Sequence, residues 1–206
     1  MPTDCEFWNK AADKYAKSSI KDQDSYRRTL DHTRRYLSNT GHVLELGCGT
    51  GSTALLLIDA VGHMTATDIS TRMIEIAKEK AVAEEHGNLS FQQIEVFEQQ
   101  HPDDSFDAVL AFNYLHLVND LPAELAKIRQ RLKAGGVFVS KTACLGRRKW
   151  VFGPLIMVMR WLGKAPFVNL MTDAQLEDAI KSAGFEIVEV TSYPAKKGSR
   201  FIVARV

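Results

Sequence analysis

The chain has 206 residues, of which 45% are hydrophobic and 25% are charged, enough apolar material for the core of one ordinary domain. Its 26 Lys and Arg nearly balance its 25 Asp and Glu, which argues against a surface that neutralises long stretches of nucleic acid. The three cysteines, Cys5, Cys48 and Cys144, are too widely separated for a disulfide framework or a zinc motif. The N-terminus has no signal-peptide pattern, and the most apolar segment, 150–162, is too short to cross a bilayer, so we expect a cytoplasmic protein with reduced thiols.

From about residue 40 onward, strand-like and helix-like patterns alternate, which predicts an α/β sheet with mainly parallel strands. Thr172 and Gln175 predict a capping box at the start of the last helix, and Gly184 predicts its end. The expected strands, in chain order, are 42–46, 64–68, 89–94, 106–112, 137–140, 185–190 and 201–206. The expected helices are 52–61, one that contains 73–81, 121–132 with a stop at 133–136, and 172–183.

Two segments lie outside this alternation. Residues 1–38 read as one or two helices placed before the sheet. Residues 143–171 form a long connection rich in Trp, Phe, Met, Leu and Arg, and connections of this length inside a compact domain are more often functional than idle.

A glycine-rich turn is the sharpest local signal. The strand at 42–46 leads into Gly47, Gly49 and Gly51 and then into a helix, an arrangement that lets a ligand approach the backbone and the free N–H groups of a helix start. The third glycine comes one residue too early for the dinucleotide fingerprint, and no Lys-Ser/Thr pair follows, so a P-loop is excluded. With the acid Glu45 just before the turn, this spacing argues against a pyrophosphate cofactor.

A second acid, Asp68, ends the next strand and is therefore expected at the carboxyl edge of the sheet, beside the glycine turn. A carboxylate at this place can accept both hydroxyls of a ribose. The alternative is that Asp68 only caps the helix that follows it.

E-L-G-C-G-T-G at 45–51, with D-I-S at 68–70, resembles the nucleoside-binding motifs of class I S-adenosylmethionine-dependent methyltransferases. The segment WNKAADKY at 8–15 is similar to the lead-in helix of the type-11 and ubiquinone-biosynthesis branch, which acts on small molecules. The resemblance implies a Rossmann-like α/β fold: a seven-stranded, mostly parallel sheet with an antiparallel last strand and helices on both faces. It also implies S-adenosylmethionine as cofactor and S-adenosylhomocysteine as product.

The family's cofactor contacts carry over to matching positions. The glycine turn would pass under the methionine and ribose, Asp68 would hold the ribose hydroxyls, Asn113 would lie beside the methionine portion, and Tyr15 would close over its amino-acid end. Ile94-Glu95-Val96 stands where the family usually has Gly-Asp-Ala, and Glu95 is a longer stand-in for the acid at the adenine amine. The full expected set is Tyr15, Glu45, Gly47, Cys48, Gly49, Gly51, Asp68, Ile69, Met73, Glu95, Val96 and Asn113.

Methyl transfer requires alignment and exclusion of water, and it needs a base only if the acceptor must lose a proton. His116 and Tyr114, near the end of the fourth strand, are the candidate catalytic residues, and packing among apolar neighbours is the alternative for His116. No metal site is expected, because Asn113, Ser140 and Lys141 stand where magnesium-dependent relatives cluster carboxylates.

Several acceptors are disfavoured by missing motifs. The segment 113–116 lacks the prolines of enzymes that methylate base amines in DNA or RNA, and no cysteine follows a proline, as cytosine-C5 chemistry requires. The connection 143–171 allows three interpretations: a lid over a lipophilic acceptor, a membrane-surface contact through 147–164, or a core helix with a charged end.

We therefore expect one methyltransferase domain over 1–206 that methylates a small, apolar acceptor and binds no DNA. Its parts are N-terminal helices at 1–40, a cofactor-binding core at 41–142, an apolar lid or insert at 143–171, and a C-terminal helix and hairpin at 172–206. The alternatives are a protein or tRNA methyltransferase and a non-catalytic S-adenosylmethionine-binding module.

Overall fold

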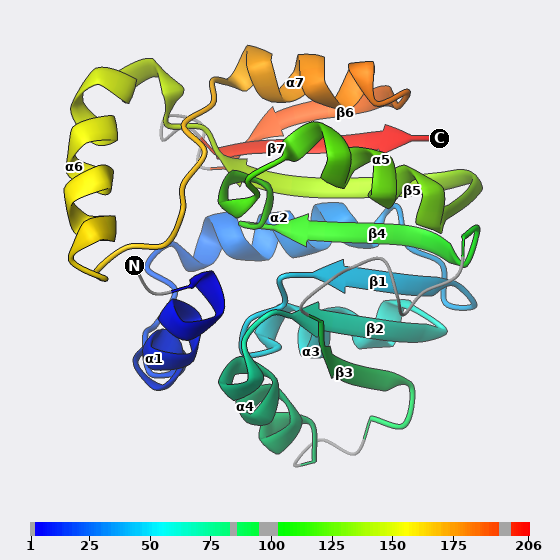
Figure 1. The fold of residues 1–206 in the computed structure, drawn as a ribbon. Coiled ribbons are helices and arrows are strands. Elements are labelled where there is room, and N and C mark those ends of the chain that lie inside the picture. Colours follow the sequence, from blue (N-terminus) through cyan, green and yellow to red (C-terminus); the bar gives the residue numbers. More distant parts are fainter. Residues whose placement is uncertain (1–2, 83–85, 95–102, 194–198) are drawn as a thin grey trace.

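The computed structural model describes residues 3–82, 86–94, 103–193 and 199–206. They contain a seven-stranded sheet in the order β3-β2-β1-β4-β5-β7-β6 (Figure 1). Strand β7 pairs antiparallel with β5 and β6, whereas the other pairs are parallel, which confirms the expected Rossmann-like architecture. The strands are β1 His42–Leu46, β2 His63–Asp68, β3 Leu89–Gln93, β4 Phe106–Phe112, β5 Leu132–Ala143, β6 Glu186–Ser192 and β7 Ser199–Arg205.

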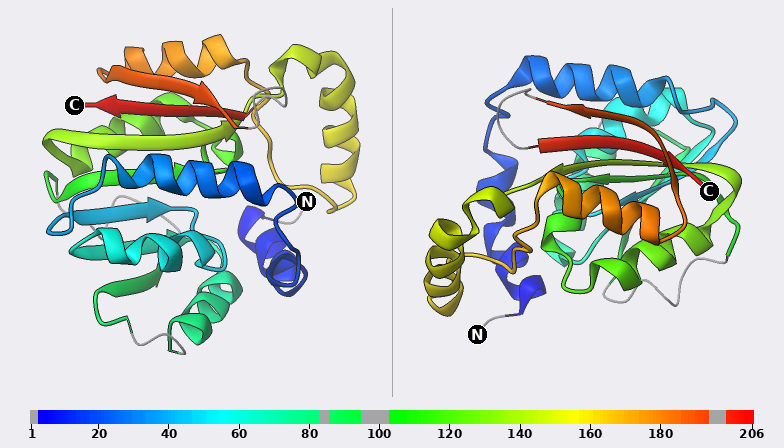
Figure 2. Two further views of the ribbon diagram at one scale, coloured as in Figure 1. Left: turned by 180° about the vertical axis from the view of Figure 1, so that it is seen from behind. Right: turned by 90° about the horizontal axis from the view of Figure 1, so that it is seen from above.

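Helices cover both faces of the sheet (Figure 2). On one face, α5 and α7 bury residues such as Leu125 and Leu176 against the sheet; on the other, α2 and α3 bury Leu30 and Leu57. The α-helices are α1 Asp4–Ala16, α2 Gln23–Arg34, α3 Ser52–Leu57, α4 Thr71–Val82, α5 Leu121–Arg131, α6 Lys149–Trp161 and α7 Asp173–Ser182. Short 3-10 helices are η1 Ile58–Ala60, η3 Leu115–Leu117 and η4 Gly146–Arg148.

Most element boundaries follow local signals. Thr172 and Gln175 form the predicted capping box of α7, and Gly184, at φ 87°, follows the end of that helix. The main difference is β5, which extends from Leu132 to Ala143 instead of 137–140. Its early start, within the predicted helix stop at 133–136, goes with pairing of Leu132 with Phe106 of β4, and its late end goes with pairing with β7 through Ala143. The connection at 194–198 of the predicted hairpin lies outside the described residues, whereas its two strands pair as expected.

Helices α1 and α6 both lie beyond the carboxyl ends of the parallel strands (Figure 1). Helix α1 starts with a capping box between Thr3 and Glu6, and α2 follows it, so the N-terminal segment forms two helices. Helix α6 buries none of its residues, so the interpretation of this segment as a core helix was wrong. In the described part of the chain, no helix combines the length and apolar character needed to span a membrane.

Candidate functional site

The glycine turn connects β1 to α3 at the carboxyl edge of the sheet. Gly47, Gly49 and Gly51 have φ angles of 65°, 55° and 75°, a region that side chains other than glycine rarely adopt. The turn is tied to the neighbouring strand β2 by the Cys48 N–H, which donates to the Thr67 carbonyl at 2.9 Å. The predicted strand–turn–helix is therefore present, with Gly51 as the residue that precedes α3.

The three glycines serve different purposes. A Cβ on Gly51 would lie 2.7 Å from the Phe91 ring, so this glycine is required by internal packing. A Cβ on Gly47 would lie 2.7 Å from the Tyr114 ring. A Cβ on Gly49 would meet only Tyr15, at 3.7 Å, which leaves open space above that position for a ligand.

Asp68 lies directly beside this turn. Its Oδ2 accepts a hydrogen bond from the Gly49 N–H at 2.9 Å, and its Oδ1 accepts one from the Ser70 N–H at 2.9 Å. Burial raises the pKa of Asp68, an effect partly offset by these N–H donors. Helix α4 is capped by Ser70, whose Oγ accepts from the Met73 N–H, so Asp68 is not the cap of this helix.

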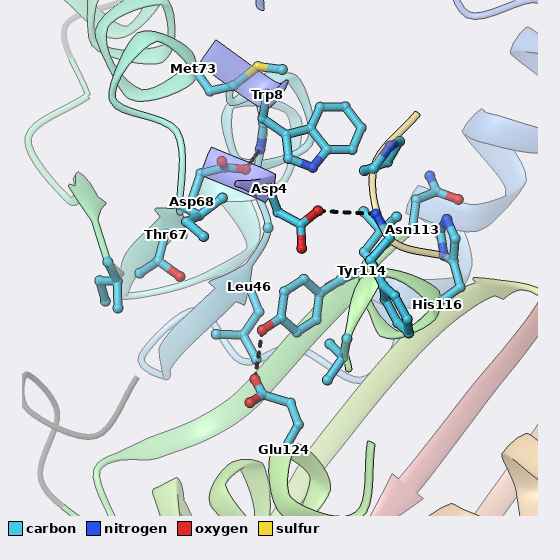
Figure 3. Close-up of a pocket in the computed structure, with 18 of the residues that line it drawn as sticks. Asp4, Trp8, Leu46, Thr67, Asp68, Met73, Asn113, Tyr114, His116 and Glu124 are labelled. Atoms are coloured by element: carbon cyan, nitrogen blue, oxygen red, sulfur yellow. Dashed lines mark hydrogen bonds between the residues drawn. The ribbon is translucent and has the colours of Figure 1, made fainter. Parts of the chain in front are cut away.

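A cavity of about 590 Å³ opens at this edge of the sheet (Figure 3). Nine of the expected cofactor and catalytic residues line it: Tyr15, Gly47, Gly49, Asp68, Ile69, Met73, Asn113, Tyr114 and His116. Cys48, Gly51 and Glu45 do not line it, and Glu95 and Val96 lie outside the described residues. The structure thus gathers contributions from α1, the glycine turn, the ends of β2 and β4 and the start of α4 around one cavity.

Glu45 lies within β1, only 2% exposed. Burial, together with the nearby charge of Asp68, raises the pKa of Glu45 from its ordinary 4.5 to about 8, so the side chain is mostly protonated at pH 7. Among the described residues, no hydrogen-bond partner exists for its Oε2. Burying a carboxyl with an unpartnered oxygen lowers the free energy of unfolding, so a substitution of Glu45 should change the stability of the protein.

The chain after β4 supplies the wall opposite Asp68. Asn113 has a positive φ of 54°, and its N–H donates to the Lys141 carbonyl at 2.7 Å, so the end of β4 is held in a sparsely populated conformation beside the cavity. Tyr114 donates its hydroxyl hydrogen to Glu124 Oε1 at 2.7 Å. Burial and the adjacent Glu124 raise the pKa of Tyr114 well above its ordinary value, so this hydroxyl stays protonated and engaged.

His116 also lines the cavity, but burial lowers its pKa to about 4. The imidazole is therefore neutral near pH 7, and its Nδ1 has no hydrogen-bond partner among the described residues. A neutral imidazole can accept a proton, although a pKa this low makes it a weak base.

Helix α1 and the segment after α6 complete the cavity wall. Trp8 lines it and packs edge-on against Tyr15, with ring centroids 6.4 Å apart. The Phe167 N–H donates to Asp4 Oδ1 at 3.1 Å, which ties the 166–167 segment to α1 (Figure 3). Asn9 Oδ1 accepts from the Ser70 hydroxyl at 2.7 Å and thereby fixes α1 to the start of α4.

Sequence reasoning missed the contributions of Asp4, Glu124 and Phe167. The segment 143–171 reaches the cavity through Pro166 and Phe167, while no residue of α6 lines it. Only the resemblance of 8–15 to a lead-in helix pointed toward the wall formed by α1. No local pattern marked Glu124, because its role depends on the position of α5 beside Tyr114.

The residues present fit S-adenosylmethionine. The open space above Gly49 admits a ligand against the backbone, and the Asp68 carboxylate retains acceptor capacity for ribose hydroxyls beyond its two N–H bonds. Ile69, Met73 and Ile94 supply apolar surface for an adenine ring beside it. Among the described residues, no cluster of three or more His, Cys, Asp or Glu side chains is arranged to hold a metal ion.

Comparisons with known proteins agree with this geometry. Residues 43–136 match the family model described as "Methyltransferase domain". The chain is 29% identical over 177 residues to demethylmenaquinone methyltransferase of Leptospira interrogans, covering 81% of this chain and 67% of that protein. It is 31% identical over 172 residues to the reducing polyketide synthase grgA of Penicillium sp, but this match covers 74% of the chain and only 7% of the synthase.

A solved structure described as an S-adenosylmethionine-dependent methyltransferase from Mesorhizobium loti superposes with a TM-score of 0.71. It covers 90% of this chain and 99% of that one at 18% identity, a similarity that shows the shared fold. Residues 43–136 therefore belong to a methyltransferase domain, and the order of the seven strands and the glycine turn beside Asp68 give the chain the fold of class I S-adenosylmethionine-dependent methyltransferases.

Proposed function

We propose that this chain transfers a methyl group from S-adenosylmethionine to a small, lipophilic acceptor by in-line displacement. The observation that carries the proposal is one cavity in which the glycine turn and Asp68 lie together with a group of apolar side chains. These are Trp8, Phe112, Leu117, Val118, Pro166 and Phe167, and polar side chains such as Asp4, Asn119 and Lys127 also line the cavity. Apolar pockets with a few fixed polar groups are typical of small-molecule sites.

The chain's own residues would act mainly by positioning. Bound S-adenosylmethionine supplies an electrophilic methyl group on a sulfonium. Gly47, Gly49 and Asp68 would hold the nucleoside part, and Asn113 and Tyr15 would hold the methionine part. Trp8 and Phe167 would exclude water from the space beside it, and proximity in such a dry site accounts for a large share of many rate enhancements.

A base is needed only for an acceptor that must lose a proton. His116 is proposed for this role, because it is neutral and its Nδ1 lacks a partner among the described residues. Tyr114 is the weaker candidate, because its hydroxyl already donates to Glu124; we propose that it orients the acceptor instead. Cys48 and Gly51 would act through the shape of the turn.

The nature of the acceptor is supported by these apolar side chains and by the similarity to demethylmenaquinone methyltransferase, whose name specifies a quinone-type acceptor. Methylation of protein or tRNA is the less favoured function, because such an enzyme would need a basic groove beside the cavity. The three free cysteines support the proposal of a cytoplasmic location. A non-catalytic S-adenosylmethionine-binding module is the alternative from a different class.

The test uses the purified chain, methyl-labelled S-adenosylmethionine and a cell extract. Label that partitions into organic solvent, and that is lost with Asp68→Ala, supports a lipophilic acceptor. Label found in precipitated polymer moves the assignment to protein or RNA. The enzymatic proposal is contradicted if the chain binds the cofactor but no fraction acquires label and no S-adenosylhomocysteine is released.

A further inference from the structure

Helix α6 presents an apolar face to solvent. Trp150, Met157 and Trp161 are 81%, 67% and 71% exposed. Residues at 150, 154, 157 and 161, and those at 151, 155, 158 and 162, follow helical spacing and form one continuous outward stripe. Phe152, Ile156 and Met159 occupy the other side and are partly covered, so the helix is apolar on both sides.

The charge of this segment is opposite to that of the rest of the chain. Residues 147–164 contain five Lys or Arg and no Asp or Glu, whereas the remaining residues contain 21 basic and 25 acidic side chains. Three of the basic residues, Arg147, Arg148 and Lys149, crowd the start of α6, where the helix dipole favours acids. Local helix stability therefore does not explain them.

Few of these charges are neutralised within the described structure. Arg147 lies 3.4 Å from the Asp173 carboxylate, and Arg160 stacks over the Phe167 ring at 5.0 Å. Arg148, Lys149 and Lys164 form no ion pair with a described residue and are exposed. An exposed apolar stripe with tryptophans near both ends and basic residues beyond them complements one particular surface, an anionic lipid bilayer.

We propose that α6 binds the surface of a membrane containing anionic lipids, with Trp150 and Trp161 at the headgroup level. The helix is 13 residues long and lies apart from the sheet beside α1, so it can rest on a bilayer without spanning it (Figure 2). Through Arg160 and Phe167 it adjoins the cavity wall. Delivery of a lipophilic acceptor from the bilayer rests on the proposed function, but binding to the membrane does not.

Co-sedimentation with lipid vesicles tests the proposal without any turnover. Vesicles of phosphatidylcholine mixed with phosphatidylglycerol should retain the chain, added salt should release it, and phosphatidylcholine alone should retain it weakly. The Arg148→Glu/Lys149→Glu variant should lower partitioning at least about tenfold, because each basic residue near an anionic surface contributes severalfold to binding. Trp150→Ser/Trp161→Ser should lower it about tenfold as well.

The matched control is Arg27→Glu/Arg28→Glu, which makes the same kind of charge change on exposed positions of α2 and should leave partitioning within about twofold of the parent. Equal losses in both charge variants would overturn the proposal, as would absence of binding to mixed vesicles. If the chain does not bind vesicles but self-associates, and if Trp150→Ser/Trp161→Ser abolishes the self-association, the apolar face of α6 would instead bind a second copy of the chain. Failure of the label-transfer test with intact vesicle binding would leave the membrane contact standing and remove only the proposed function.

Discussion

Replacing Glu45 by glutamine tests how the site is built, because this carboxyl is buried with one oxygen unpartnered among the described residues. In the folded chain its pKa is about 8, whereas in the unfolded chain it returns to about 4.5. Between these values the folded state holds a proton that the unfolded state has released. The free energy of unfolding therefore falls as pH rises through this window, by about 1.4 kcal/mol per pH unit from this group.

The magnitude follows from the two pKa values. At pH 7, protonating Glu45 on folding costs about 3 kcal/mol, a cost that glutamine does not have. The raised pKa of Glu45 already includes the effect of the nearby Asp68 charge, so that effect adds no further gain. We expect Glu45→Gln to unfold at higher urea concentration at pH 7, with a gain of about 3 kcal/mol that shrinks toward zero near pH 4.5.

The assay is urea denaturation of both proteins without cofactor from pH 4.5 to pH 8. Glu186→Gln, at an exposed position of β6, is the matched control and should change stability by less than about 0.5 kcal/mol at every pH. A pH-independent difference for Glu45→Gln, or a loss of stability at pH 7, would refute the reasoning.

Three further changes probe the cavity. Asp68→Ala should weaken cofactor binding by about 1–3 kcal/mol in calorimetry, because the ribose hydroxyls lose a charged acceptor; unchanged affinity would contradict the site. His116→Ala should slow transfer to an acidic acceptor with cofactor affinity nearly intact, and, because its pKa is about 4, the parent's rate should show no step from this group between pH 5.5 and 7.5. Tyr114→Phe should lower the free energy of unfolding by about 1–3 kcal/mol in urea denaturation, because the buried Glu124 carboxyl loses the hydrogen bond that the Tyr114 hydroxyl donates; an unchanged midpoint would show that water replaces the hydroxyl.

The sequence predicted much of the fold because the signals involved are local. The alternation of strand and helix patterns, the capping box at Thr172 and the turn at Gly47–Gly51 each depend on neighbouring residues, and all are present in the structure. The carboxyl-edge position of Asp68 was also predictable, since parallel strands end at a common edge. Boundaries set by pairing between distant strands, such as the length of β5, were not.

The candidate site was predicted where a motif continues along the chain and missed where separate segments meet. Glu124 of α5 meets Tyr114 across the tertiary structure, and Phe167 lines the cavity while Asp4 of α1 accepts a hydrogen bond from its backbone N–H. The three glycines looked equivalent in the sequence. In the structure, a side chain at Gly51 would clash with the Phe91 ring, whereas one at Gly49 would enter open space.

The sequence by itself determined the class of fold and the glycine turn at Gly47–Gly51, because backbone conformation at glycines and the periodicity of apolar residues are properties of short segments. Only the tertiary structure decided the protonation of Glu45 and His116 and the exposure of α6. Burial and the charges of distant neighbours set a pKa, and burial of a helix face depends on whether another element packs against it.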